Sequence, residues 1–205
     1  MPVFGGIDMH KFLLAVLGLW FALAGGQALA MPGGKFFDPE KNQWVQYGAQ
    51  YGGKSPIRRK KVRYDGPYKP GTIIVNTTER RLYHVLPNGK AMKYGIGVGK
   101  TGFQWGGTHR ITRKAEWPGW TPPAQMRARE RAKGRILPAH MKGGPNNPLG
   151  ARALYIGSTL YRVHGTNQPW TIGSAVSSGC IRLANNDVIH LYKNVTVGSR
   201  IVVKR

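Results

Sequence analysis

The sequence predicts a mostly β domain, a sandwich or a barrel, with one or two short helices, over residues 71–205. From residue 71 onward, short segments rich in β-branched and aromatic residues alternate with turn signals, such as "PNG" at 87–89. Only two segments have the composition of a helix. If residues 1–30 are removed, the remaining chain is one domain of ordinary size with a tail.

The predicted strands share a high content of Val, Ile, Tyr and Thr and lie between Gly-, Pro- or Asn-containing turns. In chain order they are "TIIVNT" (72–77), "RRLYHVL" (80–86), "KAMKYGIGVG" (90–99), "THRITRKAE" (108–116), "LGARALYIG" (149–157), "LYRVHG" (160–165) and "SRIVVKR" (199–205). The fifth and sixth are close enough in sequence to form a hairpin.

Two segments are predicted to be helical. "PPAQMRARERAK" (122–133) begins with prolines, which fit the first turn of a helix, and continues with good helix formers. "ANNDVIHLYKNV" (184–195) is expected to begin with an Asn cap and carries Asp187 in its first turn, where an acid favours the helix dipole.

Residues 9–30 have the layout of a secretory signal peptide: a short basic start, an apolar stretch and "ALA" at 28–30. An uncleaved N-terminal anchor is the alternative, although the apolar stretch is short for a membrane span and is broken by Gly25, Gly26 and Gln27. We therefore expect residues 1–30 to be a signal peptide and the protein to act in the periplasm.

Residues 31–70 are rich in glycine and proline and are predicted to be a basic, loosely held linker. Within them, "KSPIRRKKVR" (54–63) has six basic residues, no acid and no apolar period that would form a core. Two interpretations stay open: adhesion to an anionic surface, or a solvated tail.

The net charge of +23, from 31 basic and 8 acidic residues, favours a polyanionic partner. An exported protein rarely meets nucleic acid, and no nucleic-acid-binding motif is recognised, so a carboxylate-rich envelope polymer is the expected partner. We predict no metal and no cofactor, because the spacing of the other histidines does not suit metal binding. These are His84, His109, His140 and His190.

Cys180 is the only cysteine and cannot close an internal disulfide. As a nucleophile it needs a base, because an ordinary thiol with a pKa of about 8.5 is only a few per cent thiolate at neutral pH. His164, at the end of a predicted strand and sixteen positions earlier, is the candidate base. The alternatives are a small buried cysteine and a structural histidine.

Residues 131–186 contain no Asp or Glu and seven Lys or Arg, so a histidine there must be oriented by a neutral group. Gly179 allows a sharp turn, and the N–H groups around it and Cys180 are candidate oxyanion donors. Arg182 shares a face with Cys180 if the segment is extended, and its guanidinium suits a carboxylate. Ser177 and Ser178 are candidate donors to the substrate or caps of the turn.

These residues carry a resemblance to a known family. "HGT" (164–166), the fifteen residues that follow His164, and "SSGCIRL" (177–183) resemble the signature of the L,D-transpeptidases with a YkuD-type catalytic domain. "GGPNNPLGARALYIG" (143–157) and "GTIIVNTTERRLYHV" (71–85) are similar to that family as well. The resemblance covers residues 71–205.

The resemblance implies a sandwich-like, mostly β catalytic domain. Cys180 would be the nucleophile, His164 the base, the Gly165 carbonyl the group that orients the base, and Arg182 a ligand of a stem-peptide carboxylate. Such an enzyme cleaves the bond between the L-centre and D-alanine in peptidoglycan tetrapeptide stems. It transfers the acyl group to an amine, giving 3-3 cross-links or tethering an outer-membrane protein to the wall. Family members usually have histidine where this chain has Ser178, so hydrogen bonding in the site should differ.

A non-catalytic, basic peptidoglycan-binding envelope protein is the alternative function. We expect a monomer with no nucleic acid partner. Trp105, Trp117 and Trp120 either form a wall of the substrate groove or pack in the core. His140 is a candidate substrate contact, and His190 on the second predicted helix is expected to be structural.

Overall fold

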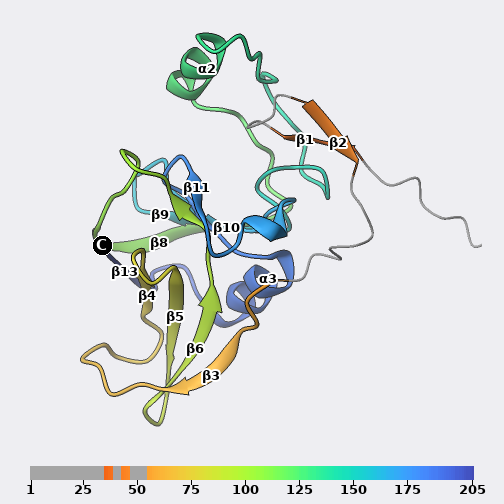
Figure 1. The fold of residues 1–205 in the computed structure, drawn as a ribbon. Helices are drawn as coiled ribbons and strands as arrows, with labels where there is room; N and C mark the ends of the chain where they lie inside the picture. The colour runs from red at the N-terminus through yellow and green to blue at the C-terminus, as the bar shows by residue number, and fades with distance from the viewer. Residues whose placement is uncertain (1–34, 39–42, 47–54) are drawn as a thin grey trace, which may run out of the picture. The chain divides into compact units, whose positions relative to one another are not determined.

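The structure is a computed structural model that describes residues 35–38, 43–46 and 55–205 (Figure 1). The expected signal peptide, residues 1–30, lies outside the described residues. Nine of the strands in the described residues form one sheet in the order β12-β10-β9-β8-β13-β4-β5-β6-β3. The β10–β12 and β13–β4 pairs are parallel and the other pairs are antiparallel.

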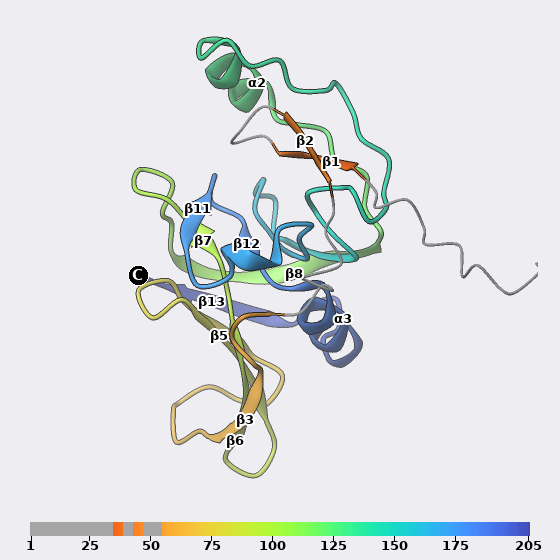
Figure 2. The ribbon, with the colours of Figure 1, turned by 45° about the vertical axis from the view of Figure 1, so that its right-hand side comes forward.

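The strands of this sheet include all seven that the sequence predicts. In chain order they are β3 (Lys60–Arg63), β4 (Ile73–Asn76), β5 (Arg81–Leu86), β6 (Lys90–Gly95), β8 (Gly107–Glu116), β9 (Arg152–Ile156), β10 (Arg162–His164), β12 (Ile181–Arg182) and β13 (Arg200–Lys204). Two strands outside it, β7 (Val98–Gly99) and β11 (Ala175–Ser177), pair in parallel. Figure 2 shows β7, β11 and β12 close together. A separate hairpin is formed by β1 (Lys35–Asp38) and β2 (Gln43–Gln46).

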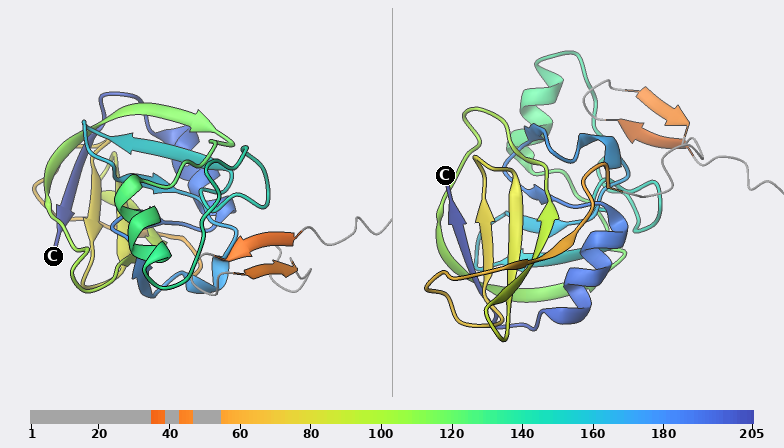
Figure 3. Two further views of the ribbon diagram at one scale, coloured as in Figure 1. Left: turned by 90° about the horizontal axis from the view of Figure 1, so that it is seen from above. Right: turned by 60° about the horizontal axis from the view of Figure 1, so that its bottom comes forward.

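The sheet curls because strand β8 passes from one part of it to the other. Its first half, up to Arg110, pairs with β13, and from Ile111 onward it pairs with β9, with a register shift between Ile111 and Arg113. Figure 3 shows β8 beside β9 in one view and β13, β4, β5 and β6 side by side in the other. The expected mostly β, sandwich-like fold is thus confirmed, with one curled sheet as its framework.

A single apolar cluster fills the curled sheet. It includes fully buried side chains from β4, β5, β6, β8, β9, β10, β12 and β13, among them Ile73, Leu82, Ile111, Leu154, Val163, Ile181 and Ile201. These strands carry the β-branched residues that the sequence pattern singles out. Their burial is the main favourable contribution to folding here.

Helix α3 (Asn185–Asn194) adds Val188 and Leu191 to the same core. The expected Asn cap is wrong: Ala184 occupies the N-cap position, and no side chain caps the helix. The side chain of Asn185 is used elsewhere, because its Oδ1 accepts hydrogen bonds from the N–H groups of Ala151 (2.9 Å) and Thr166 (3.2 Å).

Helix α2 (Ala124–Arg131) confirms the other helix prediction and lies in the long connection between β8 and β9. This connection, residues 117–149, has a small apolar cluster of its own, made of Trp120, Leu137 and Leu149 with Met126 and Met141 against it. None of the helices in the described residues is long and apolar enough to cross a membrane.

Residues 60–63, which the sequence analysis assigns to the loosely held linker, form edge strand β3 and pair with β6. Edge pairing is made by backbone hydrogen bonds and needs no apolar period, which is why the sequence pattern missed it. Three of the four side chains, Lys60, Lys61 and Arg63, are exposed. Just before the strand, Arg59 forms a 2.9 Å ion pair with Asp187 on α3.

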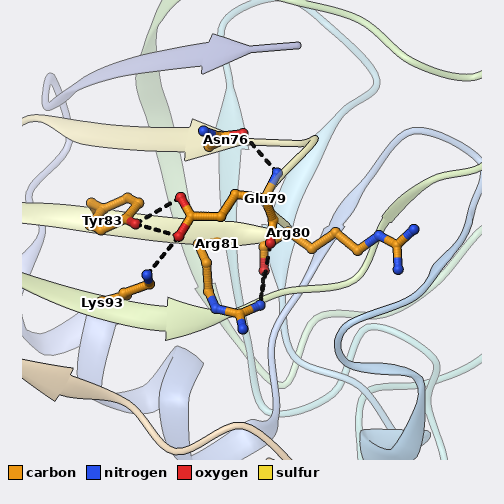
Figure 4. Close-up of polar contacts among 6 residues, drawn as sticks. All are labelled: Asn76, Glu79, Arg80, Arg81, Tyr83 and Lys93. Carbon is orange, nitrogen blue, oxygen red and sulfur yellow. Dashed lines mark hydrogen bonds and ion pairs between the residues drawn. The ribbon is translucent and has the colours of Figure 1, made fainter.

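A polar network on the surface holds the β4–β5 turn against β6 (Figure 4). Asn76 Oδ1 accepts from the Glu79 N–H at 2.9 Å. The Glu79 carboxylate accepts from the Tyr83 hydroxyl at 2.7 Å and from Lys93 Nζ at 2.6 Å. Because these groups are solvent-accessible, the network fixes the turn more than it stabilises the fold.

Candidate active site

A cavity of about 550 Å³ contains most of the residues that the sequence analysis singles out. Its lining includes His164, Ser177, Ser178, Cys180 and Arg182. The remaining walls come from α2 and the loops around it, from Lys100 and Phe103 after β7, and from the segment before β10. The cavity therefore joins parts of the chain that are up to about eighty positions apart.

The sheet places His164 and Arg182 on the same side. Strands β10 and β12 run parallel with Val163 opposite Ile181 and His164 opposite Arg182. Val163 and Ile181 are buried in the main core. Because side chains alternate across a strand, their neighbours His164 and Arg182 face away from that core and toward the cavity.

His164 is buried, and its ring is oriented by a backbone carbonyl. Its Nδ1 lies 2.5 Å from the Gly165 carbonyl oxygen. A carbonyl can only accept, so Nδ1 carries the proton and Nε2 of the neutral ring carries the lone pair. Burial, with the nearby positive charge of Arg182, lowers the pKa of His164 to about 3, against the opposing effect of backbone hydrogen bonds. The imidazole is therefore neutral at physiological pH.

Gly165 is required at its position by close packing. A side chain there would overlap the Asn185 Oδ1, which binds the neighbouring N–H groups of Ala151 and Thr166. The same amide thus ties the start of α3 to the chain on both sides of His164. This explains how the orienting carbonyl is held in place without a carboxylate.

Cys180 ends a tight turn that is closed by Ser177. The Ser177 hydroxyl donates to the Cys180 carbonyl at 2.6 Å and accepts from the Gly179 N–H at 3.2 Å. The Gly179 N–H, one of the two expected oxyanion donors, is thus engaged within the turn, and the Ser177 hydroxyl is engaged as well. Gly179 has a φ of 105°, a conformation that favours glycine.

Trp105 and Tyr161, which lie outside the sequence motif around Cys180, support this turn. Trp105 Nε1 donates to the Gly179 carbonyl at 2.7 Å, and its ring stacks on Tyr161 at 4.5 Å with an interplanar angle of 5°. A trans peptide directs its C=O and N–H to opposite sides. The bond from Trp105 therefore fixes the Cys180 N–H on the side away from the tryptophan.

The Cys180 side chain is half-buried, and its sulfur lies 4.0 Å from the Leu160 carbonyl oxygen. This position on the cavity wall differs from that of a cysteine packed in the core. Nearby, Arg182 Nη1 donates to Oε1 of Gln168 at 3.3 Å, and Gln168 is itself buried. The guanidinium is thereby held at the cavity.

Ser178 meets a residue that the sequence analysis missed. Arg129 on α2 donates from Nη2 to the Ser178 hydroxyl at 3.1 Å. The two are 49 positions apart, and no local pattern marks Arg129 among its neighbouring arginines. At the position where the family usually has histidine, this chain therefore has a serine bonded to an arginine of α2.

The remaining candidates are three tryptophans and two histidines, and only Trp120 among them lines the cavity. Trp120 lines the cavity, whereas Trp117 is exposed and Trp105 supports the Cys180 turn. His140 is not among the lining residues, and its Nδ1 bonds to the Thr121 hydroxyl at 2.8 Å. His190 bonds through Nδ1 to the Tyr94 hydroxyl at 2.8 Å, away from the cavity.

Comparison with known proteins connects this geometry with a family. The model of the L,D-transpeptidase catalytic domain, YkuD, matches residues 70–203. Two proteins of Escherichia coli K12, the probable L,D-transpeptidases YbiS and ErfK/SrfK, are 44% and 43% identical over 135 and 136 residues. These matches cover 63% and 64% of this chain and 43% of each relative, so the chain spans less than half their length.

A solved structure is similar as well. The L,D-transpeptidase from Mycobacterium smegmatis is 21% identical, with a TM-score of 0.48 over 65% of this chain and 58% of that chain.

Proposed function

The chain belongs to the L,D-transpeptidase (YkuD) catalytic domain family, and on that premise we propose that it remodels peptidoglycan with Cys180 as its nucleophile. The substrate is a tetrapeptide stem, whose bond between the L-centre of the third residue and D-alanine is cleaved. The observation that carries the proposal is that His164, Cys180 and Arg182 line one cavity, with the His164 ring held by the Gly165 carbonyl.

The first half-reaction begins with the transfer of the Cys180 thiol proton to Nε2 of His164. The sulfur attacks the carbonyl carbon, and the Cys180 N–H is the candidate donor to the developing oxyanion. Collapse of the tetrahedral intermediate breaks the C–N bond. His164 returns its proton to the leaving nitrogen, D-alanine departs, and a thioester remains on the sulfur.

In the second half-reaction an amine attacks the thioester. His164 takes the proton of the amine and returns it to the sulfur as the new amide forms. An amine from a second stem gives a 3-3 cross-link, whereas an amine of an outer-membrane protein tethers that protein to the wall. The thioester conserves the energy of the cleaved amide, so no cofactor is needed.

The charge of the site favours an acidic peptide. We assign Arg182 to a carboxylate of the stem. Burial and the charge of Arg182 keep His164 neutral, which is the form able to accept the thiol proton. The signal-like residues 1–30 support action in the periplasm, where the stems are found.

Purified protein and defined tetrapeptide muropeptides test this proposal. The wild type should release D-alanine, and mass spectrometry should identify the acyl product as a cross-linked dimer, an exchange product or a free tripeptide. Cys180→Ala should reduce release by at least about 10⁴-fold, because removal of a nucleophile removes the covalent route. Undiminished release by Cys180→Ala, with both proteins equally folded by circular dichroism, would contradict it.

The non-catalytic alternative is not favoured. It requires a thiol packed in the core, whereas the Cys180 side chain is half-buried at the cavity. Under native conditions, iodoacetamide should therefore label Cys180 rapidly.

A further inference from the structure

We propose that Arg129 and Lys100 form a second anion subsite, on the Ser178 side of Cys180, that binds a carboxylate of the peptide substrate. The proposal rests on the proposed function and names a feature of its substrate: a second free carboxylate, in addition to the one assigned to Arg182. None of the motifs in the sequence includes Arg129 or Lys100.

Three contacts place the two cations at one corner of the cavity. Arg129 lies over the ring of Phe103, with Cζ 4.8 Å from the ring centroid, and Lys100 Nζ lies 5.9 Å from the same centroid. Arg129 also donates to Ser178, two residues before the cysteine. All four of these side chains line the cavity. The corner is thus adjacent to the nucleophile and is formed by α2 and the segment after β7.

The positive charge of this corner exceeds the negative charge near it. Among the ion pairs of the described residues, none includes Lys100, and the acid close to Arg129 is Glu130, at 3.4 Å from Nε. Glu130 is shared with Lys133 at 3.5 Å and Arg135 at 2.7 Å. Burial tends to raise the pKa of Glu130, but these cations outweigh it and keep the carboxyl ionised.

The single carboxylate of Glu130 therefore balances part of the charge of three cations, and Lys100 adds a fourth positive charge. Like charges around one ring repel each other, and an anion bound beside Arg129 and Lys100 would relieve that repulsion. The planar guanidinium favours a carboxylate, which it can bind with two hydrogen bonds.

The corner is separate from the site at Arg182. Arg182 belongs to β12 and is held by Gln168, whereas Arg129 belongs to α2 and reaches the other side of the turn at Ser178. Arg129 and Arg182 thus reach the cavity from different elements. A substrate that fills both needs two carboxylates, which makes an acidic peptide the preferred class and predicts weaker binding when one carboxylate is amidated.

The test compares Arg129→Gln, Lys100→Gln and the matched control Arg127→Gln. Arg127 lies on the same helix but is exposed and is not among the lining residues. Each variant is assayed with a tetrapeptide muropeptide and with analogues in which one free carboxylate at a time is an amide. Arg129→Gln should raise KM by about 10- to 100-fold for the carboxylate form, the range expected for a lost charged hydrogen bond.

If Arg129 binds one carboxylate, the analogue in which that carboxylate is an amide should raise KM for the wild type by a similar factor. The same analogue should cause no further rise in KM for Arg129→Gln, and this result identifies the bound carboxylate. Lys100→Gln should act in the same direction with a smaller effect. Arg129→Lys should recover part of the affinity, and Arg127→Gln should match the wild type.

An equal loss on every substrate, or slower iodoacetamide labelling in Arg129→Gln, would overturn the subsite in favour of a purely structural arginine. An unchanged KM would overturn it as well. A wild type that releases no D-alanine would instead refute the proposed function, so the two failures are distinguishable.

Discussion

Two regions line the same cavity: strands β10 and β12, and the segment of residues 117–149. They differ in the number of buried apolar side chains that hold them in place. His164 and Arg182 alternate with Val163 and Ile181, which belong to the main apolar cluster of the domain. The 117–149 segment depends on a cluster of three buried side chains. The proposed base thus lies on the well-packed part and Arg129 on the weakly packed part, while Cys180 lies in the turn directly before β12.

This difference suggests that the first region positions reacting atoms and the second recognises the substrate. Reacting atoms need positions fixed to a fraction of an ångström, which strands in a packed sheet provide. Substrate recognition tolerates movement, and segments with few buried contacts open at lower free energy. Loss of the proposed base on the sheet face should therefore reduce kcat, whereas changes in the 117–149 segment should mainly raise KM.

After Cys180→Ala, the largest effect is expected for His164→Gln. The amide is close in size to the imidazole but cannot accept and return the thiol proton, so kcat should fall by about 10²- to 10⁴-fold. Steady-state D-alanine release measures the loss, and circular dichroism checks the fold. A kcat within threefold of the wild type in a folded variant would remove His164 from the chemistry.

A pair of glycines compares the two regions directly. Gly179 and Gly134 have φ values of 105° and 74°, so alanine is strained at both, by about 1 kcal/mol or more. An added Cβ at Gly179 would also overlap the Tyr161 ring, whereas none of the described atoms lies within 4 Å of one at Gly134. Overpacking of this kind costs a further 1–3 kcal/mol or so.

Gly179→Ala should therefore lower Tm more than Gly134→Ala and reduce kcat by about 100-fold, because it moves the nucleophile turn. Gly134→Ala should leave kcat unchanged. Equal effects of the two substitutions on kcat would show that the turn is not held as tightly as its contacts indicate.

A further prediction concerns the pH dependence of stability, which leaves catalysis aside. Burial and Arg182 lower the pKa of His164 to about 3, from 6.5 in the unfolded chain. Between these values the unfolded state binds one more proton, so the free energy of unfolding should fall as pH drops from 6.5 toward 3, by at most about 1.4 kcal/mol per pH unit.

Urea unfolding at pH 7, 6, 5 and 4 measures this slope. His164→Gln should have a shallower slope than the wild type. His84 and His190, whose pKa values burial also lowers, remain in both proteins and give a residual slope of the same sign. Asp187, whose pKa burial raises, acts in the opposite direction. Identical slopes would mean that His164 is not buried in its neutral form.

The sequence predicted the longer elements because their signals are local. β-branched runs between turns predict β4, β5, β8, β9 and β13, and composition predicts α2 and α3. Strands β11 and β12 were missed because they contain three and two residues and depend on pairing with β7 and β10. Strand β3 was missed because its charged residues have no apolar alternation.

The candidate site divides in the same way. Cys180, His164, Gly165 and Arg182 lie within nineteen consecutive positions and carry a recognisable motif. Trp105 and Arg129 contact the cysteine turn from 74 and 49 positions away, and such contacts depend on the tertiary fold. Residues 184–195 show the limit of a local rule, since Asn185 binds two distant N–H groups and does not cap its own helix.

The central claim is a covalent bond between Cys180 and the acyl part of the stem. Intact-protein mass spectrometry, after rapid acid quenching of the reaction with a tetrapeptide muropeptide, tests it most directly. The account predicts one adduct with the mass of the substrate less D-alanine, located on the peptide that contains Cys180 and removed by hydroxylamine. Turnover without any such adduct, or the same adduct on Cys180→Ala, would contradict it.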